Sequence, residues 1–206
     1  MKNLFITFEG GEGCGKSTHS RLLKRYLESK GYKVVLTFEP GGTHIGRFLR
    51  KMLLKGAILN SRYSELLLFA ADRAEHVKNV IMPALNAGTM VICDRFIDST
   101  TAYQQGGRKI DKTIVRLINK LSSGGLVPDI TFLLDVEPKI GIRRGTRHTG
   151  KDKFESENGG FHRRVRSTYL NIAKSHPKRV KVISSNCPVE EVQKMIRKLM
   201  DEKLGN

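Results

Sequence analysis

Eight residues near the start of the chain have the types and spacing of a phosphate-binding loop. Residues 10–17, GGEGCGKS, fit the pattern G-x-x-x-x-G-K-[ST] and lie between an apolar run and a helical pattern. The glycines let backbone N–H groups turn toward phosphate oxygens, and the helix that follows adds its own free N–H groups. Lys16 supplies a cation for the outer phosphates and Ser17 a hydroxyl for Mg²⁺. The loop therefore predicts a protein that binds a nucleoside triphosphate.

A charged pair, Asp94 and Arg95, directly follows another apolar run. In open parallel sheets ligands gather at the carboxyl ends of the strands, where this pair and the phosphate-binding loop would both emerge. Asp94 can hold Mg²⁺ through water, and the guanidinium of Arg95 can bind a phosphate with two nitrogens. A surface ion pair between the two side chains is the alternative interpretation.

Phe69 and Arg73 are four residues apart in a long helical pattern, so their side chains project from one face. From there they could stack on a nucleotide base and hydrogen-bond to it. The alternative is a core phenylalanine beside a salt-bridged arginine. In a shorter helical pattern Arg47 and Arg50 share a neighbouring face, from which either could reach an anionic substrate, although surface arginines are the commoner outcome.

The segment 143–153 is basic, contains glycine and is short of large apolar residues. Such a composition suits a flap that closes over phosphates better than it suits a core. A basic loop without that role is the alternative.

Five apolar runs, at 4–8, 34–38, 90–93, 130–134 and 180–183, alternate with helical patterns. This alternation predicts a parallel sheet flanked by helices. One long helix is expected over about 62–87, bent or broken near Pro83. Two further amphipathic patterns are expected to pack into the core, through Ile45, Phe48, Leu49, Met52 and Leu53 in one helix and through Ile114, Val115, Leu117, Ile118 and Leu121 in another.

Length and composition favour one α/β domain over 1–206, with 39% hydrophobic residues. No apolar run approaches the roughly 18 residues of a membrane span, and the chain enters a strand directly, so we expect a cytoplasmic protein. Cys14, Cys93 and Cys187 are widely spaced and predict free thiols. The formal charge of +17 raises the alternative of a nucleic-acid binder. Because no aromatic residues interleave the basic clusters, we expect no specific nucleic-acid binding.

These stretches resemble the thymidylate kinase family, in the same order and at its usual spacings over essentially the whole chain. The matching stretches are 8–17, EPGGT at 39–43, Phe69 with Arg73, DRFIDSTTAYQ at 94–104, PD at 128–129, LDV at 134–136 and FHRRVRSTY at 161–169. The combination of 94–104 with the phosphate-binding loop is highly specific, whereas the loop alone would fit other nucleoside monophosphate kinases.

The resemblance implies that the chain transfers a phosphoryl group from ATP to dTMP, with Mg²⁺, and so produces dTDP for dTTP synthesis. It also implies a three-layer P-loop nucleoside monophosphate kinase fold. The expected parts are a five-stranded parallel sheet flanked by helices and a small lid at about 143–155. A homodimer is the usual assembly of the family.

The family's functional residues fall on matching positions of this chain. The implied ATP-binding residues are Gly10, Gly11, Glu12, Gly13, Cys14, Gly15, Lys16, Ser17 and Thr18. The implied dTMP-binding residues are Glu39, Pro40, Arg50, Phe69, Arg73, Arg95, Thr100, Tyr103 and Gln104. Ser17 and Asp94 would hold Mg²⁺, largely through water.

Individual roles follow from the same resemblance. Glu12 would accept a hydrogen bond from the sugar 3′-OH, and Tyr103 would crowd the 2′ position and so favour deoxyribose. Phe69 would stack on thymine and Arg73 would bond its carbonyl oxygen, while Thr100 and Gln104 would contact the edge of the base. Arg95 would bind the dTMP phosphate, with Arg50 as a second cation.

The sequence Glu12-Gly13 resembles the bacterial type of this family, whose catalytic arginine comes from the lid. Arg147 is the expected catalytic cation and Arg144 the next candidate; Lys16, Arg95 and Glu12 complete the expected catalytic set. Three positions depart from the family pattern. The lid motif D-R-x-E reads DKFE at 152–155, His148 stands at a position that is commonly arginine, and Phe38 replaces the arginine that usually precedes EPGG.

Two other functions fit parts of the sequence. A kinase for dUMP or a modified pyrimidine nucleotide is one, because a pocket of Phe, Arg and Thr discriminates a 5-methyl group by only about 1 to 3 kcal/mol. A basic nucleic-acid-binding ATPase is the other, although a second acidic motif that would activate water is not recognisable.

Overall fold

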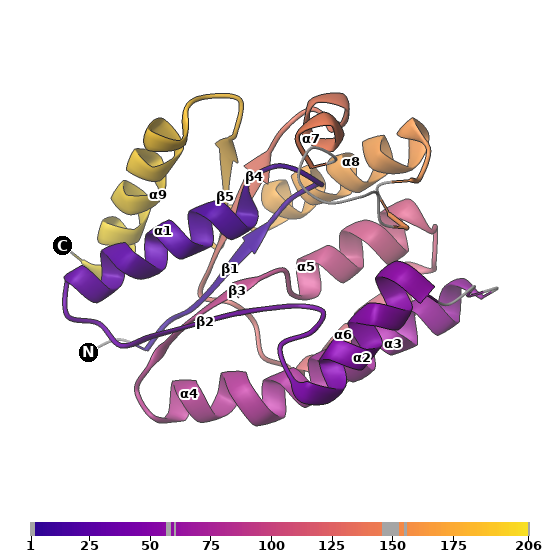
Figure 1. Ribbon diagram of the computed structural model, residues 1–206, viewed down its shortest axis with the longest axis horizontal. Coiled ribbons are helices and arrows are strands. Elements are labelled where there is room, and N and C mark those ends of the chain that lie inside the picture. Colours follow the sequence, from indigo (N-terminus) through magenta and orange to yellow (C-terminus); the bar gives the residue numbers. More distant parts are fainter. Residues whose placement is uncertain (1–2, 57–58, 60, 146–152, 155, 206) are drawn as a thin grey trace.

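A computed structural model describes residues 3–56, 59, 61–145, 153–154 and 156–205 of the chain. Its centre is a sheet of five parallel strands in the order β2-β3-β1-β4-β5 (Figure 1). The strands are β1 (Phe5–Glu9), β2 (Val34–Phe38), β3 (Met90–Asp94), β4 (Ile130–Asp135) and β5 (Val180–Ser184). Each strand matches one of the five apolar runs to within a residue, so the predicted parallel sheet is confirmed.

Helices connect the strands and cover the sheet. The described helices are α1 (Lys16–Ser29), α2 (His44–Lys51), α3 (Arg62–His76), α4 (Met82–Asn86), α5 (Ile97–Thr100), α6 (Lys112–Ser123), α7 (Pro138–Gly145), α8 (Gly159–Ser175) and α9 (Val189–Leu204). Wider π-helical turns occur at η1 (Met52–Gly56), η2 (Val77–Ile81) and η3 (Thr101–Gly107). Within the described part of the chain, no helix combines the length and apolar character needed to cross a bilayer.

The long helix expected over 62–87 is present as α3, η2 and α4 in succession. Its irregular turn, η2, ends just before Pro83, which lies in the first turn of α4. Proline has no N–H to offer the preceding turn and its ring crowds the carbonyl four residues back, so the turn before it widens.

The two faces of the sheet pack against different helices. Leu4, Ile6 and Phe8 point to the side covered by α1 and α9, where Leu23 and Ile196 are fully buried. Phe5 points to the opposite side, against Val77, Ile81 and Leu85 of the α3–α4 region, and a neighbouring cluster on that side includes α8. Alternating side chains along each strand therefore produce the three expected layers of helix, sheet and helix (Figure 1).

Two of the apolar helix faces that were predicted to be buried are largely exposed. On α2 and the turn that follows it, Ile45, Phe48 and Met52 are exposed and only Leu53 is fully buried. On α6, Val115 is buried, but Leu117 and Leu121 are 65% and 76% exposed. The prediction was wrong for these residues because an apolar stripe shows that a helix has a face to cover without showing whether this chain covers it.

The polar residues that could do chemistry collect where the strands end. The loop 10–15 follows β1, Glu39 follows β2, and Asp94 ends β3 with Arg95 directly after it. Since β1 and β2 both pair with β3 in parallel, their carboxyl ends lie at one edge of the sheet.

Candidate active site

The phosphate-binding loop is shaped by glycines and packs directly against α7. Gly13 and Gly15 have φ angles of +62° and +91°, in the left-handed region that disfavours other residues. A Cβ on Gly13 would lie 1.9 Å from the carbonyl oxygen of Gly141, so no side chain fits there. Gly15 caps α1, and no side chain satisfies the N–H groups of its first turn. These N–H groups are therefore available to an anion.

Lys16 folds its ammonium group back over this loop. Its Nζ donates to the carbonyl oxygens of Gly11, at 2.8 Å, and Gly10, at 3.3 Å, and the residue is only 7% exposed. The Cys14 thiol lies 3.5 Å from the same nitrogen, and burial raises its pKa, which favours the neutral thiol. The loop therefore holds one positive charge at the place where the sequence predicts phosphates.

Ser17, in the first turn of α1, is hydrogen-bonded to Asp94 at the carboxyl end of β3. Ser17 Oγ donates to Asp94 Oδ2 at 2.6 Å, in a position open to solvent. A hydroxyl and a carboxylate are oxygen ligands of the kind that Mg²⁺ prefers, and their exposure leaves room for its waters. The donor set therefore fits the predicted Mg²⁺ site. Asp94 contacts Ser17 and not Arg95 among the described ion pairs, so the surface ion pair considered above is not found.

Arg95 is bound to the loop through Glu12. Its Nη2 donates to Glu12 Oε1 at 2.8 Å, and its Nη1 lies 3.2 Å from the carbonyl oxygen of Gly10. Tyr103 donates its hydroxyl to the same Glu12 oxygen. Burial opposes the charge of Glu12, but Arg95 and Lys16 outweigh it and lower the Glu12 pKa to about 2. Glu12 is therefore an ionised acceptor at neutral pH.

The backbone of Arg95 is held in an unusual conformation by Glu9. Arg95 has a φ of +72°, which a side chain normally avoids. Its own N–H donates to the carbonyl of Phe8 at 2.9 Å, and the next N–H, of Phe96, donates to Glu9 Oε1 at 2.7 Å. Both peptide groups around Arg95 are thus fixed, which directs its side chain toward the loop.

The sequence analysis assigned no function to Glu9. An acidic residue at the end of a buried strand could have indicated that it is functional. Its Oε2 accepts hydrogen bonds from Ser99 Oγ, at 2.6 Å, and from the Tyr169 hydroxyl, at 3.0 Å. Burial and the nearby Asp98 raise the pKa of Glu9 to about 7. Ser99 also receives a bond from Arg95, at 3.3 Å, so one network joins Glu9 to the Arg95 guanidinium.

Every position that the family resemblance assigned to dTMP lines one cleft beside the loop. The cleft has a volume of about 120 Å³ and is bounded by Glu12, Glu39, Pro40, Arg50, Leu54, Phe69, Arg73, Arg95, Ser99, Thr100, Tyr103, Gln104 and Phe154. Glu12 belongs to the loop as well, so the cleft and the loop form one continuous site. Leu54, Ser99 and Phe154 are additions that the sequence motifs did not identify.

Phe154 closes the cleft from the segment predicted to be the lid. Its ring lies 5.9 Å from that of Phe69 and 5.6 Å from that of Tyr103, centroid to centroid. The neighbouring Lys153 donates to Glu65 Oε2 at 3.0 Å. A single large apolar residue in an otherwise basic segment was the signal that could have marked Phe154.

Arg73 and Gln104 are both positioned by carboxylates. Arg73 Nε donates to Glu39 Oε2 at 2.9 Å, and Gln104 Nε2 donates to Glu65 Oε1 at 3.1 Å. Arg73 is therefore salt-bridged, as the alternative interpretation expected, and it lines the cleft as well.

Arg50 reaches the cleft from α2 and contacts Phe38. Its Nη1 donates to the carbonyl of Pro40 at 2.7 Å, and its guanidinium carbon lies 5.5 Å from the centre of the Phe38 ring. Phe38 stands where the family pattern has an arginine, and its ring provides an aromatic surface for the guanidinium of Arg50.

The candidate catalytic arginines of the lid are placed only in part. Arg144 lies in the last turn of α7, where its Nη1 donates to the carbonyl of Ser185 at 2.8 Å, and it is not among the residues that line the cleft. Arg147 and His148 lie outside the described residues, as do Asp152 and Glu155.

Comparisons with known proteins agree on one family. The model of the thymidylate kinase family matches residues 8–196. The chain is 47% identical to a thymidylate kinase of Dehalococcoides mccartyi, over 98% of each protein. It is 44% identical to one of Gloeobacter violaceus, over 96% of this chain and 94% of the relative. The crystal structure of thymidylate kinase from Ehrlichia chaffeensis superposes with a TM-score of 0.80 at 39% identity, covering 98% of this chain and 99% of that one.

Proposed function

This chain belongs to the thymidylate kinase family and phosphorylates dTMP to dTDP with ATP, and we propose that it does so across the cleft beside the phosphate-binding loop. The observation that carries the proposal is that all positions expected to bind dTMP line a single cavity which also includes Glu12 of the loop. Donor and acceptor phosphates would then meet at Glu12, Lys16 and Arg95, and dTDP would pass on to dTTP synthesis.

The loop forms the donor half of the site. The N–H groups of residues 10–18 bind the ATP phosphates, and Lys16 moves from its carbonyl contacts to the outer phosphates. Mg²⁺ would be held by Ser17 and Asp94, largely through water, and when bound it neutralises charge on the phosphoryl group that is transferred.

The cleft forms the acceptor half. Arg95 binds the dTMP phosphate, with Arg50 as a second cation, while Phe69 stacks on thymine. Arg73 bonds a carbonyl oxygen of the base, and Glu39 and Pro40 form the adjacent wall. Thr100 and Gln104, which are both buried, contact the edge of the base.

Glu12 and Tyr103 select the sugar. The low pKa of Glu12 keeps it ionised, so it accepts a hydrogen bond from the 3′-OH. The Tyr103 ring, which packs against Phe154 and Tyr169, lies against the 2′ position and leaves no room for a ribose hydroxyl, while its own hydroxyl donates to Glu12.

The catalysis itself needs alignment and positive charge. The acceptor is already an anionic phosphate oxygen, so no general base is required. Lys16 and Arg95 neutralise the developing charge, and Arg147 of the lid, or Arg144 in its place, supplies the remaining cation.

A coupled assay of ADP release tests the proposal directly. With ATP and Mg²⁺ present, we expect kcat/KM for dTMP to exceed that for dUMP, CMP and AMP by at least tenfold, because the site contacts both base and sugar. Ribothymidine monophosphate should be a poor acceptor for the parent protein and for Tyr103→Phe alike, since the ring excludes its 2′-OH.

Two controls decide between the proposal and its alternatives. ADP release that is equally fast without an acceptor, or that requires DNA or RNA, would contradict the kinase cleft and support a nucleic-acid-dependent ATPase. Equal rates with dUMP and dTMP would leave the phosphate contacts in place but remove selection for the methyl group.

We also propose that the protein is a homodimer in the cytoplasm and that 1–206 form one domain. Support for the dimer comes from α2, α3 and α6, which lie side by side (Figure 1). Their outer surfaces carry Phe48, Leu67 and Leu121, which are 59%, 54% and 76% exposed. Contiguous exposed apolar helix faces are typical of surfaces that another protein covers.

Sedimentation velocity tests the dimer. We expect the parent protein to sediment as a dimer and the double variant Leu117→Glu/Leu121→Glu to dimerise at least tenfold more weakly, because each leucine contributes about 1.5 to 3 kcal/mol when buried. Val189→Glu is a matched control, since Val189 is also exposed but lies on α9. A double variant that sediments like the parent would show that α6 is not the interface.

A further inference from the structure

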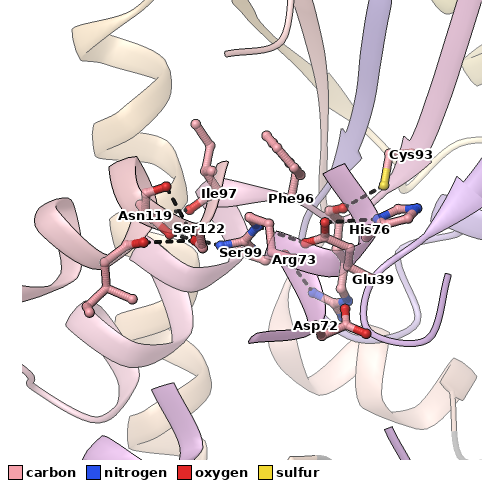
Figure 2. A network of polar contacts seen from close by, with 12 residues as sticks. Glu39, Asp72, Arg73, His76, Cys93, Phe96, Ile97, Ser99, Asn119 and Ser122 are labelled. Atoms are coloured by element: carbon pink, nitrogen blue, oxygen red, sulfur yellow. Dashed lines mark hydrogen bonds and ion pairs between the residues drawn. The ribbon is translucent and has the colours of Figure 1, made fainter. Parts of the chain in front are cut away.

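The guanidinium group of Arg73 is held from two opposite sides. Its Nε donates to Glu39 Oε2 at 2.9 Å, and its Nη1 donates to Asn119 Oδ1 at 2.9 Å. Figure 2 shows Arg73 lying between these two side chains, of which Glu39 directly follows β2 and Asn119 belongs to α6. Arg73 itself is only 2% exposed.

On the β2 side, the contact to Glu39 is reinforced by buried groups. Glu39 Oε1 lies 3.0 Å from His76 Nδ1, and the other ring nitrogen of His76 lies 2.6 Å from Thr37 Oγ1. All three residues are buried, so the carboxylate is fixed when it meets Arg73.

On the α6 side, Asn119 can present only its carbonyl oxygen. Its Nδ2 donates to the carbonyl oxygen of Ile97, at 3.1 Å, and to Thr101 Oγ1, at 3.2 Å. A flipped amide would place its oxygen against the Ile97 carbonyl and its NH₂ group against the cation, and both contacts would be repulsive. The direction of the Asn119 amide is therefore determined by its neighbours.

These contacts leave one nitrogen of Arg73 for a ligand. Among the hydrogen bonds of the described residues, Nε and Nη1 are engaged and none involves Nη2, while the side chain lines the cleft. An arginine carries donors only, so the group that faces Nη2 must be an acceptor. A pyrimidine carbonyl oxygen meets this requirement, and an amino group at the same position does not.

We propose that Asn119 is a positioning residue that makes the enzyme discriminate between a carbonyl and an amino group on the pyrimidine. This inference rests on the proposed contact between Arg73 and the base. Together with Glu39, Asn119 fixes the rotation of the planar guanidinium group about the Cδ–Nε bond and so keeps Nη2 directed to the cleft. Without the Asn119 amide, the guanidinium group of Arg73 can turn, and Nη2 no longer faces the base in a single orientation.

Asn119 also joins Arg73 to the segment that contacts the edge of the base. Ile97 begins α5, Thr101 directly follows Thr100 at the start of η3, and Gln104 lies one turn later. A single amide thus sets the spacing between Arg73 on α3 and the contacts made by this segment. Asn119 does not line the dTMP cleft, so its effect passes through these neighbours.

The test compares dTMP with dCMP, which carries an amino group where thymine has a carbonyl. For Asn119→Ser, whose hydroxyl is too short to reach Nη1, we expect the ratio of kcat/KM for dTMP to that for dCMP to fall about tenfold. The fall should come from a higher KM for dTMP, while kcat changes by no more than about twofold and KM for ATP is unchanged.

Two further variants keep the test decisive. Thr101→Val keeps the shape of Thr101 but removes the acceptor that orients the Asn119 amide, and we expect a smaller fall in the same ratio, of about threefold. Ser122→Ala is the matched control, because Ser122 is buried one turn further along α6 and, among the hydrogen bonds of the described residues, donates only to the carbonyls of Ile118 and Asn119. For Ser122→Ala, the ratio of kcat/KM for dTMP to that for dCMP should equal that of the parent protein.

The outcomes separate this inference from the proposed function. If Arg73→Met leaves the ratio unchanged, the contact of Arg73 with the base is wrong. If Arg73→Met lowers the ratio while Asn119→Ser and Thr101→Val, shown to be folded by circular dichroism, do not, only the role of Asn119 is overturned. Equal losses of kcat with both acceptors in Asn119→Ser, at an unchanged ratio, would also overturn it.

Discussion

Replacing Lys16 with alanine is expected to lower kcat at least a hundredfold. Lys16 Nζ lies 2.8 Å from the carbonyl of Gly11, so its charge is held at the loop that binds the ATP phosphates. Removing one preorganised donor to a developing negative charge typically costs about 10² to 10³ in rate. The measurement is ADP release at saturating ATP and dTMP, with thermal unfolding to verify that the variant is folded.

Lys24→Ala is the matched control for Lys16→Ala. Lys24 lies on the same helix, α1, but pairs with Glu28 near the surface at 3.0 Å. Exposed pairs of this kind contribute about 0.3 to 0.5 kcal/mol, so turnover should be unchanged. A near-normal rate for Lys16→Ala would remove the loop lysine from the mechanism.

Replacing Arg95 with alanine is expected to lower kcat/KM for dTMP at least a hundredfold. The variant loses the cation that lies between Glu12 and the cleft and leaves the carboxylate of Glu12 facing the dTMP phosphate with less compensation. Arg95→Lys should recover only part of the loss, because an ammonium group lacks the two-pronged geometry of a guanidinium. Steady-state kinetics with dTMP varied at saturating ATP measure the effect.

Arg95→Gly distinguishes the side chain of Arg95 from its backbone. Glycine adopts the φ of +72° without strain, whereas other residues pay about 1 to 2 kcal/mol there. We therefore expect Arg95→Gly to lose as much activity as Arg95→Ala. We also expect Arg95→Gly to unfold at a denaturant concentration equal to or higher than that of Arg95→Ala. Normal kcat/KM in both variants would show that Arg95 does not bind the acceptor phosphate.

The sheet was predictable because its signals are local. Each strand appears as a short apolar run. The phosphate-binding loop appears as a run of eight residues whose glycines permit its turns. The position of Asp94 and Arg95 at the end of a parallel strand then places them beside the loop without further information. The bend near Pro83 was predictable for the same reason, and only the ends of the strands differ, by one residue.

The cleft was predictable by a different route. The residues that line it are far apart in sequence, and no periodicity joins Glu39 to Tyr103. Their common role came from the family resemblance, and the structure brings them together in one cavity. Ser99 and Phe154 lie inside stretches that match the family, but the resemblance assigned them no role, and their place in the cleft is visible only in the structure.

The sequence by itself determined the chemistry and the order of the elements, since a phosphate-binding loop, parallel strands and charged strand ends each follow from neighbouring residue types. Only the tertiary structure decided which distant groups meet: Glu12 with Arg95, Glu9 with the N–H of Phe96, and Arg73 with Asn119. It also decided that Phe48 and Leu121 face outward. A one-dimensional pattern records how polar each position is, whereas a contact depends on where the chain returns after tens of residues, and that is set by the packing of the whole fold.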